Sequence, residues 1–308
     1  MDKKFLYYLI KRVILALFTI FLVITITFFF MHLIPGDPFQ SEKAIPEPVR
    51  EALMEKYGFN DPLWKQYLTY LGNAVTLDFG LSMRMDGREV TDVIFEGFAS
   101  SAKIGFIAAA LALVMGMIFG AIAALHHNKF IDRVIMVVST AFVAMPSFIV
   151  GTLLLWIFCA ELEWLPANGM ESGGLILPII ALALYPMAYT IRLTRSSMLD
   201  VLGQDYIRTA KAKGVHPSKV LFKHALKNAV TPVITYAGPM IAFILTGSLV
   251  VERIFTVPGL GDHFFSSIQN RDYTMIMGTT IFLATIIVIM MLVSDVLYKL
   301  VDPRVELS

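Results

Sequence analysis

The sequence predicts an all-α membrane protein with six membrane-spanning helices and a partly helical loop between the first two. Three observations lead to this prediction. Hydrophobic residues make up 57% of the 308-residue chain and charged residues only 16%, against about 25% in ordinary soluble domains. Six apolar stretches approach or exceed the roughly 20 residues that cross a bilayer as a helix. Lysine and arginine residues gather in alternate loops between these stretches, as in a multi-pass protein.

The first apolar stretch follows four basic residues, and we interpret it as a retained span. Its 21 residues exceed the roughly 7–15 apolar residues of a cleavable signal peptide. The fourth stretch is the weakest, because it is short and contains Pro178 and Pro186. Membrane helices tolerate proline where neighbouring groups satisfy the freed carbonyls. The predicted spans cover residues 13–33, 104–125, 134–158, 175–191, 233–251 and 275–297.

The basic residues predict the orientation of these spans. The short loops on one side contain only Arg253 and Arg271, whereas the N-terminal tail, the loops on the other side and segment 200–232 are rich in lysine and arginine. Cytoplasmic loops carry the excess of these residues, so both termini and segment 200–232 are expected in the cytoplasm. The predicted divisions are a tail and first span (1–33), an extracellular loop subdomain (34–103) and a five-helix core (104–308).

The long loop after the first span is expected to be partly helical. One helix is predicted from Pro48 to Lys56, closed by Gly58, and a second is predicted with Pro62 in its first turn, after a cap at 60–61. A third, amphipathic helix would place residues 90, 94 and 98 on one face. Two interpretations of this third helix stay open: it lies in the membrane interface, or it forms a platform for an extracellular partner.

Segment 200–232 is a polar, basic stretch between two apolar ones. It predicts a short helix over 204–213 that stops at Gly214, and a second from Pro217 to about Val230 that ends before Pro232. A basic loop that only fixes topology is one alternative. A DNA-binding helix-turn-helix is another, which the flanking apolar spans disfavour.

The motifs of several catalytic and transport classes are missing from the sequence. It contains no Gly-x-x-x-x-Gly-Lys-Ser/Thr loop for ATP, and its six histidines do not cluster as in a zinc site. The single cysteine, Cys159, excludes an internal disulfide. No charged residue falls centrally in a predicted span, which argues against an ion-coupled carrier. We therefore expect no catalysis by this chain, and energy supplied by a partner.

The basic segment resembles a known docking loop. Residues 205–214, followed by His224-Ala225-Leu226-Lys227-Asn228-Ala229 and Pro232, are similar to the cytoplasmic EAA loop of ABC-transporter permeases. The variant is that of dipeptide, oligopeptide and nickel importers. The resemblance continues in order along the chain through the following segments: 8–12, 34–38, 56–63, 79–82, 146–148, 165–169, 192–198, 251–255, 258–261, 270–273 and 302–304.

The resemblance implies a type I ABC importer permease fold (MetI-like) and a coupling helix that docks on an ATPase. The residues expected to couple to the ATPase are Asp205, Tyr206, Ile207, Arg208, Thr209, Ala210, Ala212 and Gly214. Tyr206, Ile207 and Ala210 would share one helix face. The usual opening Glu-Ala-Ala is here Arg208-Thr209-Ala210, so the role of its acidic residue is not carried over. Gly214→Val or Ala210→Trp is expected to uncouple transport from ATP hydrolysis.

The resemblance also implies the function and the partners. The chain would be the transmembrane subunit of an ATP-driven importer in a bacterial cell membrane, forming half of a pathway for di- or oligopeptides. Its partners would be a second homologous permease, two ATPases, an extracellular solute-binding protein and lipid, with no nucleic acid. ATP and Mg would bind to the ATPases, and no cofactor to this chain. The alternatives are a permease for nickel chelates or glutathione, and a non-transporting signalling or assembly protein of the membrane.

Overall fold

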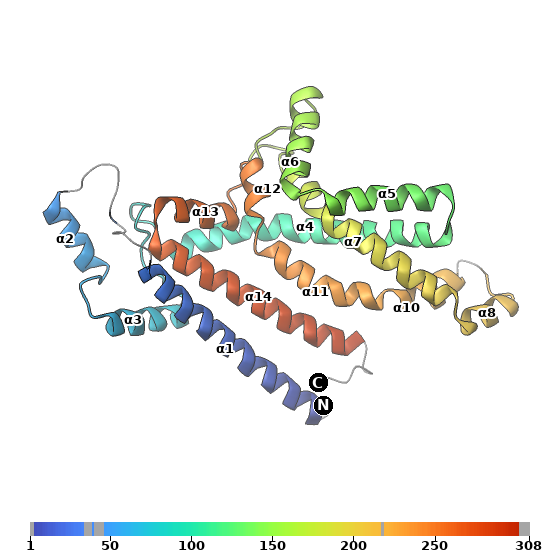
Figure 1. Cartoon of the computed structure of the whole chain (residues 1–308), viewed down its shortest axis with the longest axis horizontal. Coiled ribbons are helices and arrows are strands. Elements are labelled where there is room, and N and C mark those ends of the chain that lie inside the picture. Colours follow the sequence, from blue (N-terminus) through green and yellow to red (C-terminus); the bar gives the residue numbers. More distant parts are fainter. Residues whose placement is uncertain (1–2, 34–38, 40–45, 217–218, 302–308) are drawn as a thin grey trace. The chain divides into compact units, whose positions relative to one another are not determined.

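The computed structural model describes residues 3–33, 39, 46–216 and 219–301, and every regular element within these ranges is helical (Figure 1). The chain is divided between two compact units. Unit 1 comprises residues 1–99 and 259–289, and unit 2 comprises residues 100–258 and 290–308. The three-part division predicted from the sequence concerns membrane topology, and it stays a prediction.

Long apolar helices account for four of the six predicted spans. They are α1 (Lys3–Leu33), α4 (Val90–Leu125), α7 (Ile176–Leu202) and α14 (Tyr273–Val301). By length and hydropathy each can cross a membrane, and two bent helix pairs raise the number to six if each pair is one span. The six predicted spans therefore correspond to four unbroken helices and two bent pairs, and the number of six holds if each pair is one span.

The third predicted span is broken near its middle. Helix α5 (Phe130–Ala144) ends before Pro146, and α6 (Ser147–Leu155) continues into the π-helix η1 (Trp156–Glu161). The two parts are bent by 106°. Proline has no backbone N–H and disfavours helical geometry in the residue before it. The prediction of one continuous helix here was wrong for this reason.

The fifth predicted span begins and ends earlier than expected. Helix α10 (Lys227–Ala229) is followed by α11 (Thr231–Leu245) at a bend of 51°. Pro232 lies in the first turn of α11, where its missing N–H is tolerated, so it bends the chain and does not end the helical region. Gly247, with φ +86°, separates α11 from the short α12 (Leu249–Ile254).

Two of the three helices predicted in the long loop are present in unit 1. They are α2 (Glu47–Lys56) and α3 (Leu63–Thr76). The chain leaves α2 through Gly58, whose φ of +71° favours glycine, and enters α3 directly after Pro62. These local signals identified both helices correctly.

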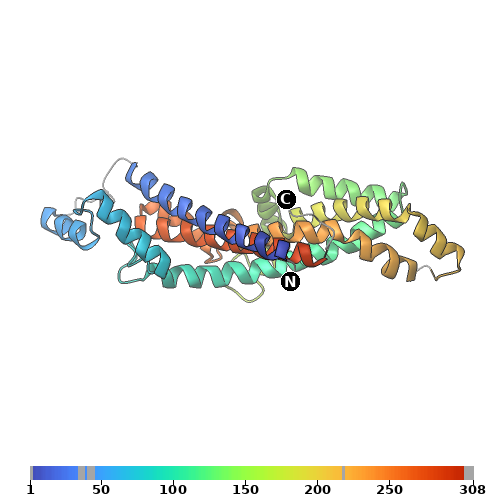
Figure 2. The ribbon, with the colours of Figure 1, turned by 90° about the horizontal axis from the view of Figure 1, so that it is seen from below.

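The third predicted loop helix is the first part of α4 and not a separate surface helix. Val90 and Ile94 share one face, as expected, but they are fully buried in the core of unit 1 together with Met275 and Ile281 of α14. Because α4 is one unbroken helix, the interpretation as an independent interfacial helix was wrong. The core of unit 1 also includes residues of α1, which runs beside α14 in both views (Figures 1 and 2).

A buried carboxylate joins two distant segments of unit 1. Helix α13 (Leu260–Asn270) is followed by Asp272, which precedes α14 and is almost fully buried. Its carboxylate accepts hydrogen bonds from the hydroxyl of Ser82, from the Met83 amide at 3.2 Å and from the Met275 amide at 3.1 Å. The Thr274 hydroxyl donates another at 3.0 Å. Asp272 thus stabilises the start of α14 and holds loop 77–89 against it.

Unit 2 is built around α7. Figure 2 shows α5 running beside α7, and α4 approaches α7 closely because two of its contact residues are glycines. A Cβ atom added to Gly116 would lie 2.5 Å from the Thr190 side chain, and one added to Gly120 would lie 2.6 Å from Thr194. Such small residues let membrane helices pack backbone to backbone.

Candidate functional site

The predicted docking helix is α8 (Asp205–Ala212), and it ends in a Schellman motif. The Gly214 amide donates to the Lys211 carbonyl at 3.0 Å, and the Val215 amide donates to the Ala210 carbonyl at 3.2 Å. This pair of bonds requires a left-handed residue at Gly214, and its φ is +73°. A Cβ atom at Gly214 would meet nothing within 4 Å. The glycine is therefore required for its backbone conformation and not for space.

One face of α8 packs against the rest of unit 2. Ile207 and Ala210 are buried in a cluster, which we call the inner-face cluster, with Met198 of α7 and Ala124 at the end of α4. The helices that follow α8 complete it with the residues Val220, Ala225 and Ala229. A movement imposed on α8 would therefore be transmitted by direct packing to the ends of α4 and α7.

The other face of α8 is open. Tyr206 is 45% exposed, and its hydroxyl accepts a hydrogen bond from the Asn228 amide at 3.1 Å. Asp205 and Arg208 form a highly exposed ion pair at 3.5 Å, which contributes little to stability. The remaining predicted site residues that are exposed are Thr209, Ala212 and Gly214.

The structure therefore brings all eight predicted site residues into one short segment but divides them between two faces. Ile207 and Ala210 point toward the chain's own core, whereas Tyr206 does not share that face. A partner could contact Tyr206 and Ala212 directly, and would sense Ile207 and Ala210 only through the packing beneath. Their role in ATPase coupling stays a prediction.

The rest of the basic segment contains an unusual helix. Residues Val220–Leu226 form a π-helix, η2, which continues into α10. Such wide turns are rare and are often found at functional sites. The predicted helix start at Pro217 lies outside the described residues. The periodicity of the sequence gave no sign of the π-helical geometry.

A large open cavity in unit 2 lies where the helices are broken. Its volume is about 670 Å³, and it is bordered by the break at Pro146, by α7 and by α11. Three tyrosines line it: Tyr185, Tyr189 and Tyr236. The rings of Tyr189 and Tyr236 lie with centroids 4.5 Å apart. Among the described residues that line the cavity, none is charged and none is a histidine.

This cavity can accept polar but uncharged groups, because the tyrosines combine apolar rings with hydroxyls that both donate and accept hydrogen bonds. In secondary transporters, substrate sites are also formed where membrane helices are broken. The sequence analysis did not identify these residues. The i, i+4 spacing of Tyr185 and Tyr189 within a proline-containing span was the one available signal.

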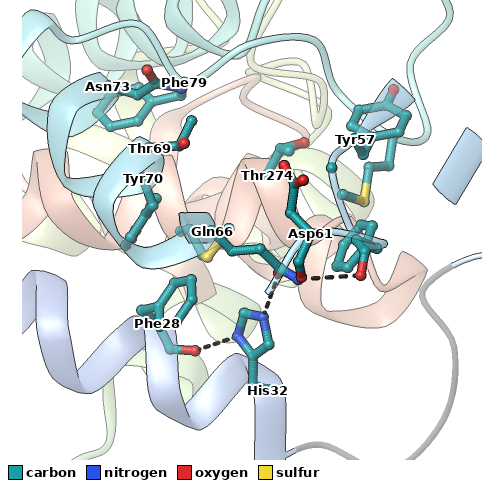
Figure 3. Close-up of a pocket in the computed structure, with 14 residues that line it drawn as sticks. Phe28, His32, Tyr57, Asp61, Gln66, Thr69, Tyr70, Asn73, Phe79 and Thr274 are labelled. Carbon is teal, nitrogen blue, oxygen red and sulfur yellow. Dashed lines mark hydrogen bonds between the residues drawn. The ribbon is translucent and has the colours of Figure 1, made fainter. Parts of the chain in front are cut away.

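A smaller cavity of about 160 Å³ lies within unit 1 (Figure 3). On one side, His32 of α1 contacts the Phe28 carbonyl at 2.8 Å and Gln66 of α3 at 3.0 Å. The Tyr70 hydroxyl is buried without a hydrogen-bond partner among the described residues, and burial raises its pKa. Burial also raises the pKa of Tyr57, with smaller contributions from nearby carboxylates. The volume is sufficient for ordered water, which would satisfy Tyr70.

No group of three or more potential metal-ligating side chains occurs within the part of the chain that the structure describes. His126, one of the adjacent pair in the loop before α5, contacts the Ile122 carbonyl at 2.9 Å through its ring nitrogen. The ring therefore has a local backbone partner at the end of α4.

Comparison with known families gives two matches that together span most of the chain. Residues 116–307 match the model described as "Binding-protein-dependent transport system inner membrane component". Residues 5–86 match the model for the N-terminal part of such membrane components.

Characterised relatives match nearly the whole chain. The dipeptide transport system permease protein DppB of Bacillus subtilis is 46% identical over 301 residues, which cover 97% of this chain and 98% of the relative. The oligopeptide transport system permease protein OppB of Haemophilus influenzae is 42% identical over 302 residues, covering 97% and 99%. OppB of Escherichia coli K12 is 40% identical with the same coverage.

Solved structures share the fold at low sequence identity. An inward-facing form of the MetNI methionine ABC transporter superposes with a TM-score of 0.58 at 15% identity, covering 68% of this chain and 96% of that one. An amino acid ABC transporter crystallised with histidines gives a TM-score of 0.51 at 20% identity, covering 70% and 95%.

Proposed function

The chain belongs to the family of binding-protein-dependent transport system inner membrane components, and we propose that it forms half of the peptide pathway of an ATP-driven importer. Its all-α, multi-pass permease fold agrees with the fold expected from the sequence. The role of a permease subunit follows from the family, and the peptide substrate is supported by the dipeptide and oligopeptide permeases among its relatives.

The observation that carries the peptide assignment is the cavity of about 670 Å³ among the broken helices of unit 2. A peptide amide moved from water to an apolar site without hydrogen bonds costs roughly 2–7 kcal/mol. The hydroxyls of Tyr185, Tyr189 and Tyr236 supply such partners, and their rings contact side chains of any kind. Because no charged or imidazole side chain of the described residues lines the cavity, its chemistry favours a peptide over a nickel chelate.

The exposed face of α8 is the proposed docking surface for an ATPase. Two ATPases would bind ATP and Mg, and this chain would bind neither. A second, homologous permease would complete the pathway, and an extracellular solute-binding protein would deliver the peptide. Both termini and the basic segment then lie in the cytoplasm. Closure of the ATPases would displace α8 and switch the pair of permeases between inward- and outward-open states.

The direct test is reconstitution of the chain in liposomes with the permease, ATPases and binding protein encoded beside it. Peptide-stimulated ATP hydrolysis together with peptide uptake would support the proposal. A complex that contains the ATPases but transports no peptide would refute the proposal. Uptake of glutathione or a nickel chelate would instead identify that compound as the substrate. Failure of any ATPase to co-purify would favour a signalling or assembly protein.

The cavity is tested by removing hydroxyls while keeping the rings. We expect a triple Tyr185→Phe, Tyr189→Phe, Tyr236→Phe variant to lower peptide uptake by on the order of 100-fold, since three lost hydrogen bonds at about 1 kcal/mol each cost about 3 kcal/mol. Tyr7→Phe is the matched control, because Tyr7 is largely exposed and lies outside the cavity. Normal uptake by the triple variant would show that the tyrosine hydroxyls do not contact the transported peptide.

A further inference from the structure

An ion pair in unit 2 joins the start of α5 to α7. The Arg195 guanidinium donates from Nε to Asp132 Oδ1 at 2.6 Å and from Nη2 to Oδ2 at 2.8 Å. The Asp132 side chain is 3% exposed and that of Arg195 is 21% exposed. The Asn128 amide donates a further hydrogen bond to Asp132 at 2.9 Å. The carboxylate is therefore held from two sides, by the loop before α5 and by α7.

The position of this pair connects the docking helix to the cavity. Arg195 lies about two turns before the end of α7, and α7 leads into α8 within two residues. Met198, one turn after Arg195, belongs to the inner-face cluster under α8. At its other end, α5 leads to the break at Pro146 that borders the large cavity. The pair thus links the helix that carries α8 to a helix that borders the cavity.

Stability alone does not explain such a pair. Taking two charges out of water costs several kcal/mol per ion, and well-packed apolar residues often replace a buried ion pair without loss of stability. A two-pronged arginine–carboxylate contact does, however, fix the relative orientation of the elements that carry it. A lysine at the same place would keep the charge but lose this geometry.

We propose that Asp132 and Arg195 are positioning residues that make α5 move with α7 when α8 is displaced, so that ATPase motion reaches the cavity. This inference rests on the proposed transport function. The inference assigns the pair to coupling and not to ATPase docking, because the two residues belong to α5 and α7 and not to the docking helix α8. The side chains of the pair contact each other directly, whereas α8 acts on them through α7.

The test uses the complete reconstituted importer and measures peptide transported per ATP hydrolysed. Arg195→Lys should lower this ratio by about tenfold, the factor equivalent to 1.4 kcal/mol, while the ATPases still co-purify and still hydrolyse ATP. Arg192→Lys is the matched control, because Arg192 is exposed on the same helix, and it should leave the ratio unchanged.

The neutral variant Asp132→Asn/Arg195→Gln guards against misfolding, because it leaves no unpaired buried charge. A folded, assembled neutral variant with a lowered ratio supports the inference. A wild-type ratio in both Arg195→Lys and the neutral variant overturns it, as does an equal fall in Arg192→Lys. If wild-type complexes show no peptide uptake at all, the proposed function fails, which is a different result from unchanged coupling in the variants.

Discussion

Replacing Asp272 with alanine should release loop 77–89 from the start of α14. The carboxylate accepts hydrogen bonds from two backbone amides, those of Met83 and Met275, and from two hydroxyls. Alanine would leave the two amides without this partner inside the protein. Each unsatisfied buried group costs roughly 1–3 kcal/mol, so the amides alone give a loss of about 2–6 kcal/mol. Both amides bond to the same oxygen, Oδ1, so Asp272→Asn can keep both hydrogen bonds and should lose much less.

Hydrogen exchange at the amides of Met83 and Met275 measures this loss directly. A change of about 2–6 kcal/mol lowers their protection by between roughly thirty-fold and four orders of magnitude, since 1.4 kcal/mol is a factor of ten. Asp78→Ala is the matched control, because Asp78 is exposed on the same loop and accepts a hydrogen bond from the nearby Gly80 amide at 3.1 Å. It should change protection by less than about 0.5 kcal/mol. Wild-type protection of both amides in Asp272→Ala would refute the assigned role of the carboxylate.

Three further predictions concern α8 and one histidine of unit 1. Gly214→Val should strain the left-handed turn by about 1–2 kcal/mol, and it should lower peptide uptake per ATP while the protein still inserts normally into the membrane. Gly214→Asn should stay near wild type, because asparagine tolerates this backbone conformation. Equal coupling in the two variants would contradict the turn argument. Ala212→Trp should block ATPase co-purification, because Ala212 is exposed. Ala210→Trp, which the sequence alone predicts only to uncouple, should reduce the amount of folded protein seen by size-exclusion chromatography, because Ala210 is buried. The opposite pattern would mean that Ala210 lies on the docking face and Ala212 on the inner face. Burial lowers the pKa of His263 below its usual 6.5. The unfolded chain therefore binds more protons, and the free energy of unfolding should fall as the pH drops below about 6.5. Thermal unfolding of His263→Gln should show a weaker fall with pH, and a pH profile identical to that of the wild type would exclude His263 as the cause.

Local physics explains why much of the fold could be read from the sequence. Apolar stretches of membrane length identified the spans, because a bilayer imposes that length on any helix. The ends of α2 and α8 were correct because Gly58 and Gly214 adopt left-handed conformations that glycine accepts at no steric cost. The helix predicted for docking is present at the expected place for the same reason, and its docking role stays a prediction.

The sequence did not determine which prolines break a helix. Pro146 precedes α6 at a bend of 106°, whereas α7 continues as one helix through Pro186. Pro186 is buried within α7, and its missing N–H leaves the carbonyl of Leu182, one turn earlier, without its intrahelical partner. Whether a helix tolerates such a carbonyl depends on the groups that neighbouring elements place beside it, and packing supplies them.

Contacts between distant residues decided the rest. The sequence contained Ser82 and Asp272, and also Asp132 and Arg195, but no local pattern relates residues that are 190 or 63 positions apart. The helical spacing of Tyr206, Ile207 and Ala210 likewise could not show which face of α8 turns inward. The sequence by itself therefore determined the class, the apolar segments and the short helix α8, because these follow from bilayer thickness and backbone preference. Only the tertiary structure decided the cavity, the ion pair and the orientation of α8, because they depend on which helices pack together.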